Sequence, residues 1–240
     1  MRRRTVGDTA GRIREDPRLR DRLGIFQDRE DAGRALAPLV SGIPDLTDPV
    51  ISAIPAGGVG VGVPLALVLR VPLHLAVVRK VQIPWNPEAG FGAVTWDGRV
   101  FLNRDLLAHL GLTQEVVAEA VAQTRAGIRE RVEKFSTGRK GPGFRGRDAV
   151  LVDDGLASGY TMLAAVDAIR SEGPRRVLVA VPTGSQAAVH RVAAIADLVL
   201  CLNIRTGSSF AVADAYREWH DLTDGEVLLL LRQAADAGLY

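Results

Sequence analysis

The chain has 240 residues, of which 47% are hydrophobic and 24% are charged, and its 30 basic and 28 acidic residues leave a formal net charge of +2. This composition excludes a disordered, collagenous or coiled-coil chain, and the near-neutral charge gives no whole-protein argument for nucleic-acid binding. Cys201 is the single cysteine, which excludes an internal disulfide framework and a cysteine-rich zinc site.

The start of the chain is polar and rich in arginine, so we expect a basic N-terminal arm over residues 1–24 and one domain over residues 25–240. The arginines are not followed by an apolar stretch of signal-peptide type. The uncharged run from Pro49 to Leu69 contains several glycines and prolines, which make it a poor membrane-spanning helix. We therefore expect a cytoplasmic protein with no membrane partner.

In the first half of the domain, the hydrophobic pattern alternates between helical and strand periods. The predicted elements are a helix over 28–39, a strand over 50–54, a glycine turn over 57–62, a helix over 64–69 and a strand over 73–78. Two further apolar runs, 91–96 and 99–102, flank Asp97-Gly98, and this dipeptide predicts a β-hairpin.

The second half continues the alternation of helices and short buried strands. It predicts a helix over 113–135, a basic glycine-rich loop over 136–147, strands over 149–152, 176–181 and 198–202, and helices over 161–171, 187–194 and 225–237. Short apolar strands that alternate with helices indicate an α/β fold with right-handed crossovers. We therefore predict a three-layer, open, mostly parallel sheet flanked by helices.

Residues 149–161, with the sequence AVLVDDGLASGYT, begin as a buried strand and end at the start of a helix. Ligands of open α/β sheets bind beyond the carboxyl ends of the strands, which is where Asp153 and Asp154 lie. Gly155 and Gly159 let the backbone turn tightly, and the start of a helix suits a phosphate. Carboxylates accept hydrogen bonds from hydroxyls or hold Mg²⁺ through water. The segment therefore predicts a site for a phosphorylated sugar.

The string VLVDDGLASGYT resembles the signature with which type I phosphoribosyltransferases bind 5-phosphoribosyl-1-pyrophosphate (PRPP). The shared pattern is an apolar strand, two acidic residues, a five-residue loop and a threonine. The strings DDGLASG, RKVQIPWNPEAGFGAV and DREDAGRAL also resemble a bacterial subgroup of this family with no assigned substrate. Together these matches extend over most of residues 26–235, and they imply hood segments over about residues 80–110 and in the C-terminal region.

The resemblance implies an enzyme that uses PRPP and Mg²⁺ to transfer phosphoribosyl to a nitrogenous acceptor, an unknown base, and releases pyrophosphate. Asp153 and Asp154 would bind the ribose hydroxyls, and the metal through water. The residues implied to wrap the 5-phosphate are Gly155, Leu156, Ala157, Ser158, Gly159 and Thr161. Those implied to bind pyrophosphate are Ala56, Gly57, Gly58, Arg79 and Lys80. Arg79 and Lys80 would be catalytic together with the two aspartates, and the resemblance also implies a homodimer.

Two residues depart from the family pattern. The relatives often carry an arginine at the position of Ala56, so one cation is missing from the pyrophosphate loop. The 6-oxopurine enzymes carry an aspartate at the position of Ala157, which disfavours hypoxanthine and guanine as acceptors. The alternative to an enzyme is a catalytically weak regulatory protein that binds PRPP or another sugar phosphate and uses the arm on nucleic acid. Because no helix-turn-helix pattern accompanies the arm, we favour the enzyme and expect no nucleic-acid partner.

Overall fold

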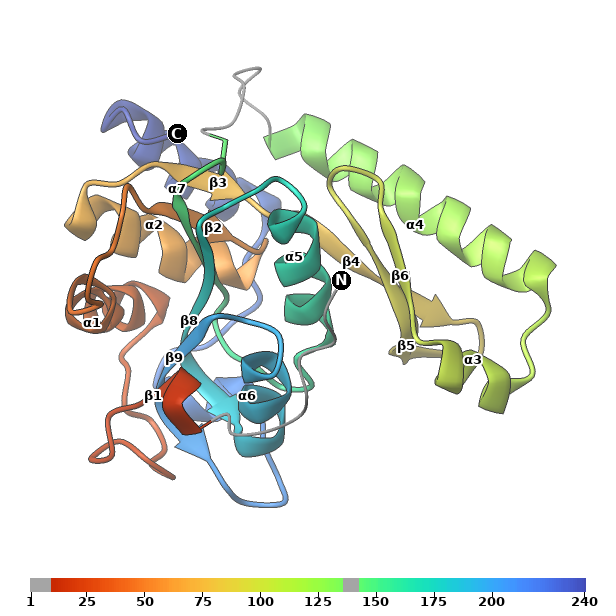
Figure 1. Cartoon of the computed structure of the whole chain (residues 1–240), viewed down its shortest axis with the longest axis horizontal. Coiled ribbons are helices and arrows are strands. Elements are labelled where there is room, and N and C mark those ends of the chain that lie inside the picture. Colours follow the sequence, from red (N-terminus) through yellow and green to blue (C-terminus); the bar gives the residue numbers. More distant parts are fainter. Residues whose placement is uncertain (1–9, 136–142) are drawn as a thin grey trace.

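The main sheet of the computed structural model, which describes residues 10–135 and 143–240, has six parallel strands (Figure 1). Their spatial order is β1 (Ile13–Arg14), β9 (Leu198–Arg205), β8 (Arg176–Ser185), β7 (Asp148–Val152), β2 (Val50–Ala53) and β3 (Leu73–Leu75). Residues 136–142 of the predicted basic loop lie outside the described residues. The parallel sheet confirms the predicted α/β class.

Helices cover both faces of this sheet, because alternate residues of each strand point to opposite faces. In β7, Val150 and Val152 face one apolar cluster, whereas Ala149 and Leu151 face the other. The helices on the first side are α1 (Arg29–Ser41), α2 (Gly57–Leu69) and α7 (Asp224–Asp236), and those on the second are α5 (Tyr160–Arg170) and α6 (Gln186–Ala193). The predicted three-layer arrangement is therefore confirmed.

A smaller antiparallel sheet lies beside the main one, with a long helix along it (Figure 1). Its strands are β4 (Val78–Ile83), β5 (Asn86–Thr95) and β6 (Val100–Leu102), and its helices are α3 (Arg104–Leu110) and α4 (Gln114–Phe135). Val81, Phe91 and Ile128 form the centre of its own apolar cluster. The predicted hairpin at Asp97-Gly98 is confirmed, with a positive φ of 81° at the glycine.

The single strand predicted over residues 73–78 is divided between the two sheets. β3 ends at Leu75, and the N–H of Ala76 donates to the carbonyl of Ala53 at 2.9 Å. Val77 and Val81 pack in the core of the smaller sheet, whereas Val78 between them still packs in a cluster of the main sheet. Both sheets bury their apolar residues, so hydrophobicity alone does not reveal where the chain leaves one for the other.

The described part of the expected N-terminal arm lies against the main sheet. Ile13 and Arg14 pair with Val199 and Leu200 of β9 as a parallel edge strand. Arg12, in the short 3₁₀ helix over residues 10–12, donates to the carbonyl of Ala193 at 3.4 Å. The sequence did not predict this edge strand, because a two-residue strand is too short to produce a periodic pattern.

The segment predicted as a glycine turn over residues 57–62 is helical, and the prediction was wrong. It forms the first turns of α2, whose residues from Gly58 to Ala66 are all buried. A Cβ on Gly62 would lie 2.8 Å from the Cβ of Ala53, so glycine lets the helix pack closely on β2. The low helix propensity of glycine is outweighed by this close packing.

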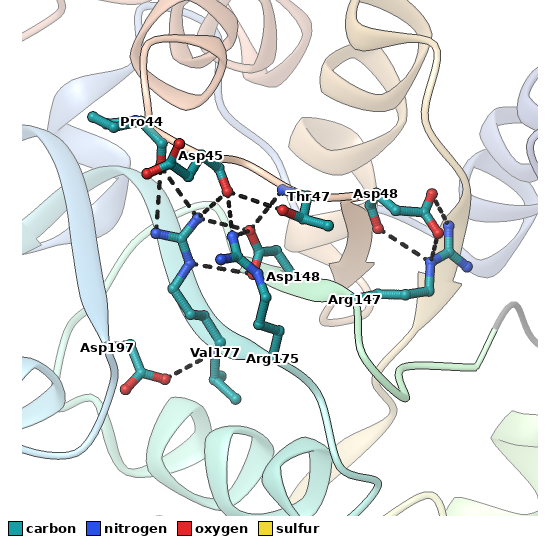
Figure 2. A network of polar contacts seen from close by, with 10 residues as sticks. Pro44, Asp45, Thr47, Asp48, Arg147, Asp148, Arg175, Val177 and Asp197 are labelled. Carbon is teal, nitrogen blue, oxygen red and sulfur yellow. Dashed lines mark hydrogen bonds and ion pairs between the residues drawn. The ribbon is translucent and has the colours of Figure 1, made fainter.

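Charged residues are concentrated at the amino end of the sheet, where Figure 2 shows Asp148 between two arginines. Its fully buried carboxylate lies 2.7 Å from Nη2 of both Arg175 and Arg176. The N–H of Thr47 also donates to it, at 2.9 Å. Because each carboxylate oxygen has donors, this buried charge is paired as protein interiors require.

A half-buried histidine lies where the two sheets meet. Nδ1 of His74 is 2.9 Å from the hydroxyl of Ser52, and its ring makes edge contacts with Trp96 and Phe144. Burial lowers the pKa of His74 from 6.5 to about 4. His74 is therefore neutral in the folded protein over a pH range where it carries a proton in the unfolded chain.

The lowered pKa of His74 predicts that this residue contributes to the loss of stability in acid. Between pH 6.5 and about 4 the unfolded chain takes up a proton at His74 that the folded chain does not, so the free energy of unfolding falls as the pH is lowered through that range. Urea denaturation at pH 7.5 and pH 4.5 measures this effect. The fall in the free energy of unfolding between the two pH values should be smaller for His74→Gln than for the wild type. His109→Gln, at an exposed position of α3, should behave as the wild type. An equal loss in His74→Gln would contradict the prediction.

Candidate functional site

The candidate site lies at the carboxyl edge of the main sheet, where the loops after β2 and β7 are neighbours. The two strands pair with Ala53 beside Val152, and the N–H of Ile54 donates to the carbonyl of Val152 at 2.9 Å. The loop after β2 contains a cis peptide bond between Pro55 and Ala56 and leads directly into α2. The loop after β7 begins with the acidic pair.

The first glycines of α2 contact this acidic pair. A Cβ on Gly57 would overlap Oδ2 of Asp154, and a Cβ on Gly58 would lie 2.5 Å from the carbonyl oxygen of Val152 and 3.0 Å from the Cα of Asp153. The structure therefore brings Gly57 and Gly58 together with both aspartates. It also brings the amino end of α2, the positive end of the helix dipole, to this point, where the N–H groups of Gly58 and Val59 donate to the carbonyls of Ile54 and Ala56.

Gly57→Ala is expected to weaken ligand binding at this site by at least about tenfold, because the new methyl group displaces the carboxylate of Asp154 and a 1 Å misplacement can cost about 100-fold. The measurement is the dissociation constant of Mg-PRPP by titration calorimetry. Gly225→Ala is the matched control: it also lies in the first turn of a helix, and its Cβ would meet only Thr223 Oγ1 at 3.9 Å. Equal affinities for the two variants would contradict this geometry.

Arg29 joins the acidic pair from a distant part of the sequence. Asp28 caps α1 by accepting from the N–H of Asp31, which makes Arg29 the first residue of the helix. Its Nε lies 2.9 Å from Oδ2 of Asp154, and its side chain is only 8% exposed. Sequence analysis did not single out Arg29, although it lies within the string DREDAGRAL. A charged residue in a first helical turn is ordinarily solvated, so only the three-dimensional contact reveals it.

The two carboxylates differ in their surroundings. Oδ1 of Asp153 accepts from the N–H of Asp154 at 2.9 Å, whereas the side chain of Asp154 is paired with Arg29. Burial raises the pKa of Asp153 well above its ordinary value, and the charge of Asp154 raises it further. Burial also raises the pKa of Asp154, and Arg29 opposes that rise. Shifted pKa values in neighbouring carboxylates are common at functional sites.

The loop over residues 153–159 is held in place by the end of β8. The N–H of Leu156 donates to Thr183 at 3.0 Å, and its carbonyl accepts from the N–H of Ser185 at 2.9 Å. The hydroxyl of Ser185 donates to the carbonyl of Ala157 at 2.8 Å. Gly159 then adopts a positive φ of 78° and leads into α5. With several carbonyls engaged by the protein, the loop and the amino end of α5 offer N–H groups to an anion.

The segment after β9 covers the site with aromatic residues. The hydroxyl of Tyr216 donates to the carbonyl of Asp154 at 2.6 Å, and the tyrosine ring contacts that of Trp219 at 5.0 Å between centroids. Trp219 in turn stacks on Arg29. For the C-terminal region the sequence predicted a hood segment but did not predict a contact between this segment and the acidic pair. Its aromatic spacing carries no signal that could have located it there.

Arg79 and Lys80 lie on β4 of the smaller sheet, and both are exposed. As neighbours on a strand they point to opposite faces. A Cβ on Gly127 would overlap Nη1 of Arg79, which places this side chain along α4. Of the residues expected to bind pyrophosphate, Gly57 and Gly58 therefore lie at the acidic pair. Arg79 and Lys80 lie on β4 of the smaller sheet.

The acidic pair fits a magnesium ion that arrives with its substrate. Within residues 10–135 and 143–240, no group of three or more histidine, cysteine or acidic side chains could hold a metal by itself. Mg²⁺ usually keeps several waters and is bound by one or two carboxylates together with substrate phosphates. Asp153 and Asp154 supply two adjacent carboxylates for such a site, although one oxygen of Asp154 is already paired with Arg29.

Comparisons with known proteins agree with this geometry. The family described as “Phosphoribosyl transferase domain” matches residues 27–214. Proteins named “Putative phosphoribosyl transferase” from two strains of Mycobacterium tuberculosis are 37% identical over 220 residues, which is 90% of this chain and 49% of each relative. The chain thus spans about half the length of the curated relatives it matches. A crystal structure of the protein TT1426 from Thermus thermophilus has 38% identity and a TM-score of 0.73, and the match covers 87% of this chain and 98% of that one.

In the described part of the chain, no helix is both long enough and apolar enough to cross a membrane.

Proposed function

Since the chain belongs to the type I phosphoribosyltransferase family, we propose that it transfers the phosphoribosyl group of PRPP to a nitrogenous acceptor and releases pyrophosphate. The observation that carries the proposal is the acidic pair beyond β7, which lies between the glycines of α2 and the loop that leads into α5. A sugar with a phosphate at each end needs such an arrangement, with hydroxyl acceptors in the middle and anion-binding backbone on either side.

The two loops are proposed to divide the substrate between them. Asp153 and Asp154 accept hydrogen bonds from the ribose hydroxyls. Residues 155–159 and Thr161, at the start of α5, bind the 5-phosphate through backbone N–H groups and the threonine hydroxyl. Residues 56–58 direct the amino end of α2 at the pyrophosphate. Arg79 and Lys80 remain proposed cations for the pyrophosphate end.

The reaction separates charge, and the site is arranged to stabilise both parts. Negative charge accumulates on the departing pyrophosphate, which the positive end of the α2 dipole would stabilise. Positive charge develops on the ribose, whose hydroxyls are held by the acidic pair. The chemistry that Mg²⁺ supplies when bound is neutralisation of the pyrophosphate charge.

The proposal is tested by measuring pyrophosphate release from Mg-PRPP with a panel of purine, pyrimidine and other nitrogenous bases. Release that depends on one class of base is the expected result. Ala56, in place of the arginine often found in relatives, makes the opposite outcome informative. PRPP binding without release for any base would support a regulatory protein that binds sugar phosphates, and would contradict the transferase.

A further inference from the structure

Arg29 is a buried cation that the roles proposed above do not use. Its guanidinium comes from the first residue of α1, yet it reaches the loop after β7, 125 residues away in sequence. Both partners of the resulting ion pair are largely shielded from water, with 8% of Arg29 and 16% of Asp154 exposed. A buried charge of this kind is costly unless its geometry is well satisfied.

Several contacts hold the guanidinium in one orientation. Nη1 of Arg29 donates to the carbonyl of His220 at 2.8 Å, and its Cζ lies 3.8 Å from the centroid of the Trp219 ring. A Cβ on Gly60 would lie 2.8 Å from Cδ of Arg29, so glycine in α2 makes room for the side chain. Residues from α1, α2, the β7 loop and the C-terminal segment therefore all fix the position of one positive charge.

The position of this charge matters because of what the site is proposed to bind. Two adjacent carboxylates repel a polyanion, and at short range in a site that is only partly open to water this repulsion is strong. The pyrophosphate loop does not supply an arginine at position 56, where the sequence has alanine. The positive charge of Arg29 neutralises one of the two carboxylate charges, so less negative charge remains to repel the substrate phosphates.

We propose that Arg29 is a positioning residue that admits the polyanionic substrate: it holds the Asp154 carboxylate against Gly57 and cancels one of the two negative charges beside the ribose. This inference rests on the proposed function, because the substrate it concerns is PRPP. Asp153 and Asp154 thereby have unequal tasks. Asp154 is fixed by a cation, whereas Asp153 is held by hydrogen bonds from the backbone N–H groups of Asp154 and Gly58.

The test compares Arg29→Gln with Arg29→Lys by titration calorimetry of Mg-PRPP. Arg29→Gln removes the charge and should raise the dissociation constant by about 10- to 100-fold, because the unmasked charge of Asp154 then repels the substrate phosphates at short range. Arg29→Lys keeps the charge but loses the guanidinium that stacks on Trp219 and donates to both Asp154 and His220, so it should raise the dissociation constant clearly less than Arg29→Gln does. Because salt screens the unmasked carboxylates, the ratio between Arg29→Gln and the wild type should shrink as ionic strength rises.

Arg34→Gln is the matched control, because Arg34 lies on the same helix in an exposed pair with Glu30 and should leave binding unchanged. Equal losses in Arg29→Gln and Arg29→Lys, or a ratio indifferent to salt, would show a packing role and overturn the inference. If Arg29→Gln does not fold, the test is how the dissociation constant of Arg29→Lys depends on salt. We expect the same salt dependence as in the wild type, and a different one would overturn the inference. A wild-type protein that binds no PRPP would overturn the proposed function itself, and this inference with it.

Discussion

Replacing Asp153 and Asp154 together by asparagine is expected to weaken PRPP binding by at least about 100-fold, because hydrogen bonds to charged groups contribute about 1.5–3 kcal/mol each. Asparagine preserves the shape of each side chain while removing the negative charge. The variant also leaves Arg29 without its ionic partner, so some loss of stability should accompany the loss of binding.

Titration calorimetry with Mg-PRPP measures this effect, and circular dichroism establishes that the variant is folded. Asp167→Asn is the control, since Asp167 is an exposed carboxylate on α5, the helix that follows the same loop. It should bind as the wild type does. If the folded double variant binds Mg-PRPP as tightly as the wild type, the acidic pair is not part of the ligand site.

Asp148→Asn is expected to lower the free energy of unfolding by about 3–5 kcal/mol, because breaking a buried ion pair leaves uncompensated charges. The carboxylate is completely buried and is shared by Arg175 and Arg176 (Figure 2). It lies at the amino end of β7, the opposite end of the strand from the acidic pair. Affinity for PRPP, measured where the variant is folded, should therefore be unchanged.

Urea denaturation measures this stability change, and its pH dependence has a definite sign. Burial alone would raise the pKa of Asp148, but hydrogen bonds from Arg176 and Arg175 outweigh it and hold the pKa below 3.8. The stabilisation is therefore fully present above that value and is lost as the pH falls through the folded pKa. The difference between wild type and Asp148→Asn should narrow in acid.

The control for this prediction is Asp48→Asn, because Asp48 is 67% exposed and pairs with Arg147 at the same end of the sheet. An exposed pair contributes at most about 1 kcal/mol. If Asp148→Asn lowers the free energy of unfolding no more than Asp48→Asn does, the result contradicts a structural role for the buried carboxylate.

Much of the fold could be predicted because strands and helices leave periodic patterns in the sequence. The run before Asp153 is buried on both faces in the structure, as expected of a central parallel strand. The glycines from Gly57 to Gly62 were misassigned because their local preference for turns is overridden by packing against β2 and the acidic pair. Whether a helix needs glycines for close packing depends on the residues that surround it in the fold, and the sequence of the segment alone does not show this.

The site was predictable only in its local part. Asp153, Asp154 and the loop up to Thr161 are contiguous, so one segment contains the whole pattern. Arg29, Tyr216 and Trp219 reach the same point from both ends of the chain and have no pattern of their own. Their contribution depends on which helices and loops lie at the carboxyl edge, which is a property of the assembled sheet.

The central claim is that this edge of the sheet binds PRPP, and the most direct test is titration calorimetry of Mg-PRPP into the wild-type protein. The predicted result is saturable binding of one PRPP per chain, competed by ribose 5-phosphate and by pyrophosphate because each occupies part of the site. The absence of saturable binding, or binding that neither fragment displaces, would contradict the account.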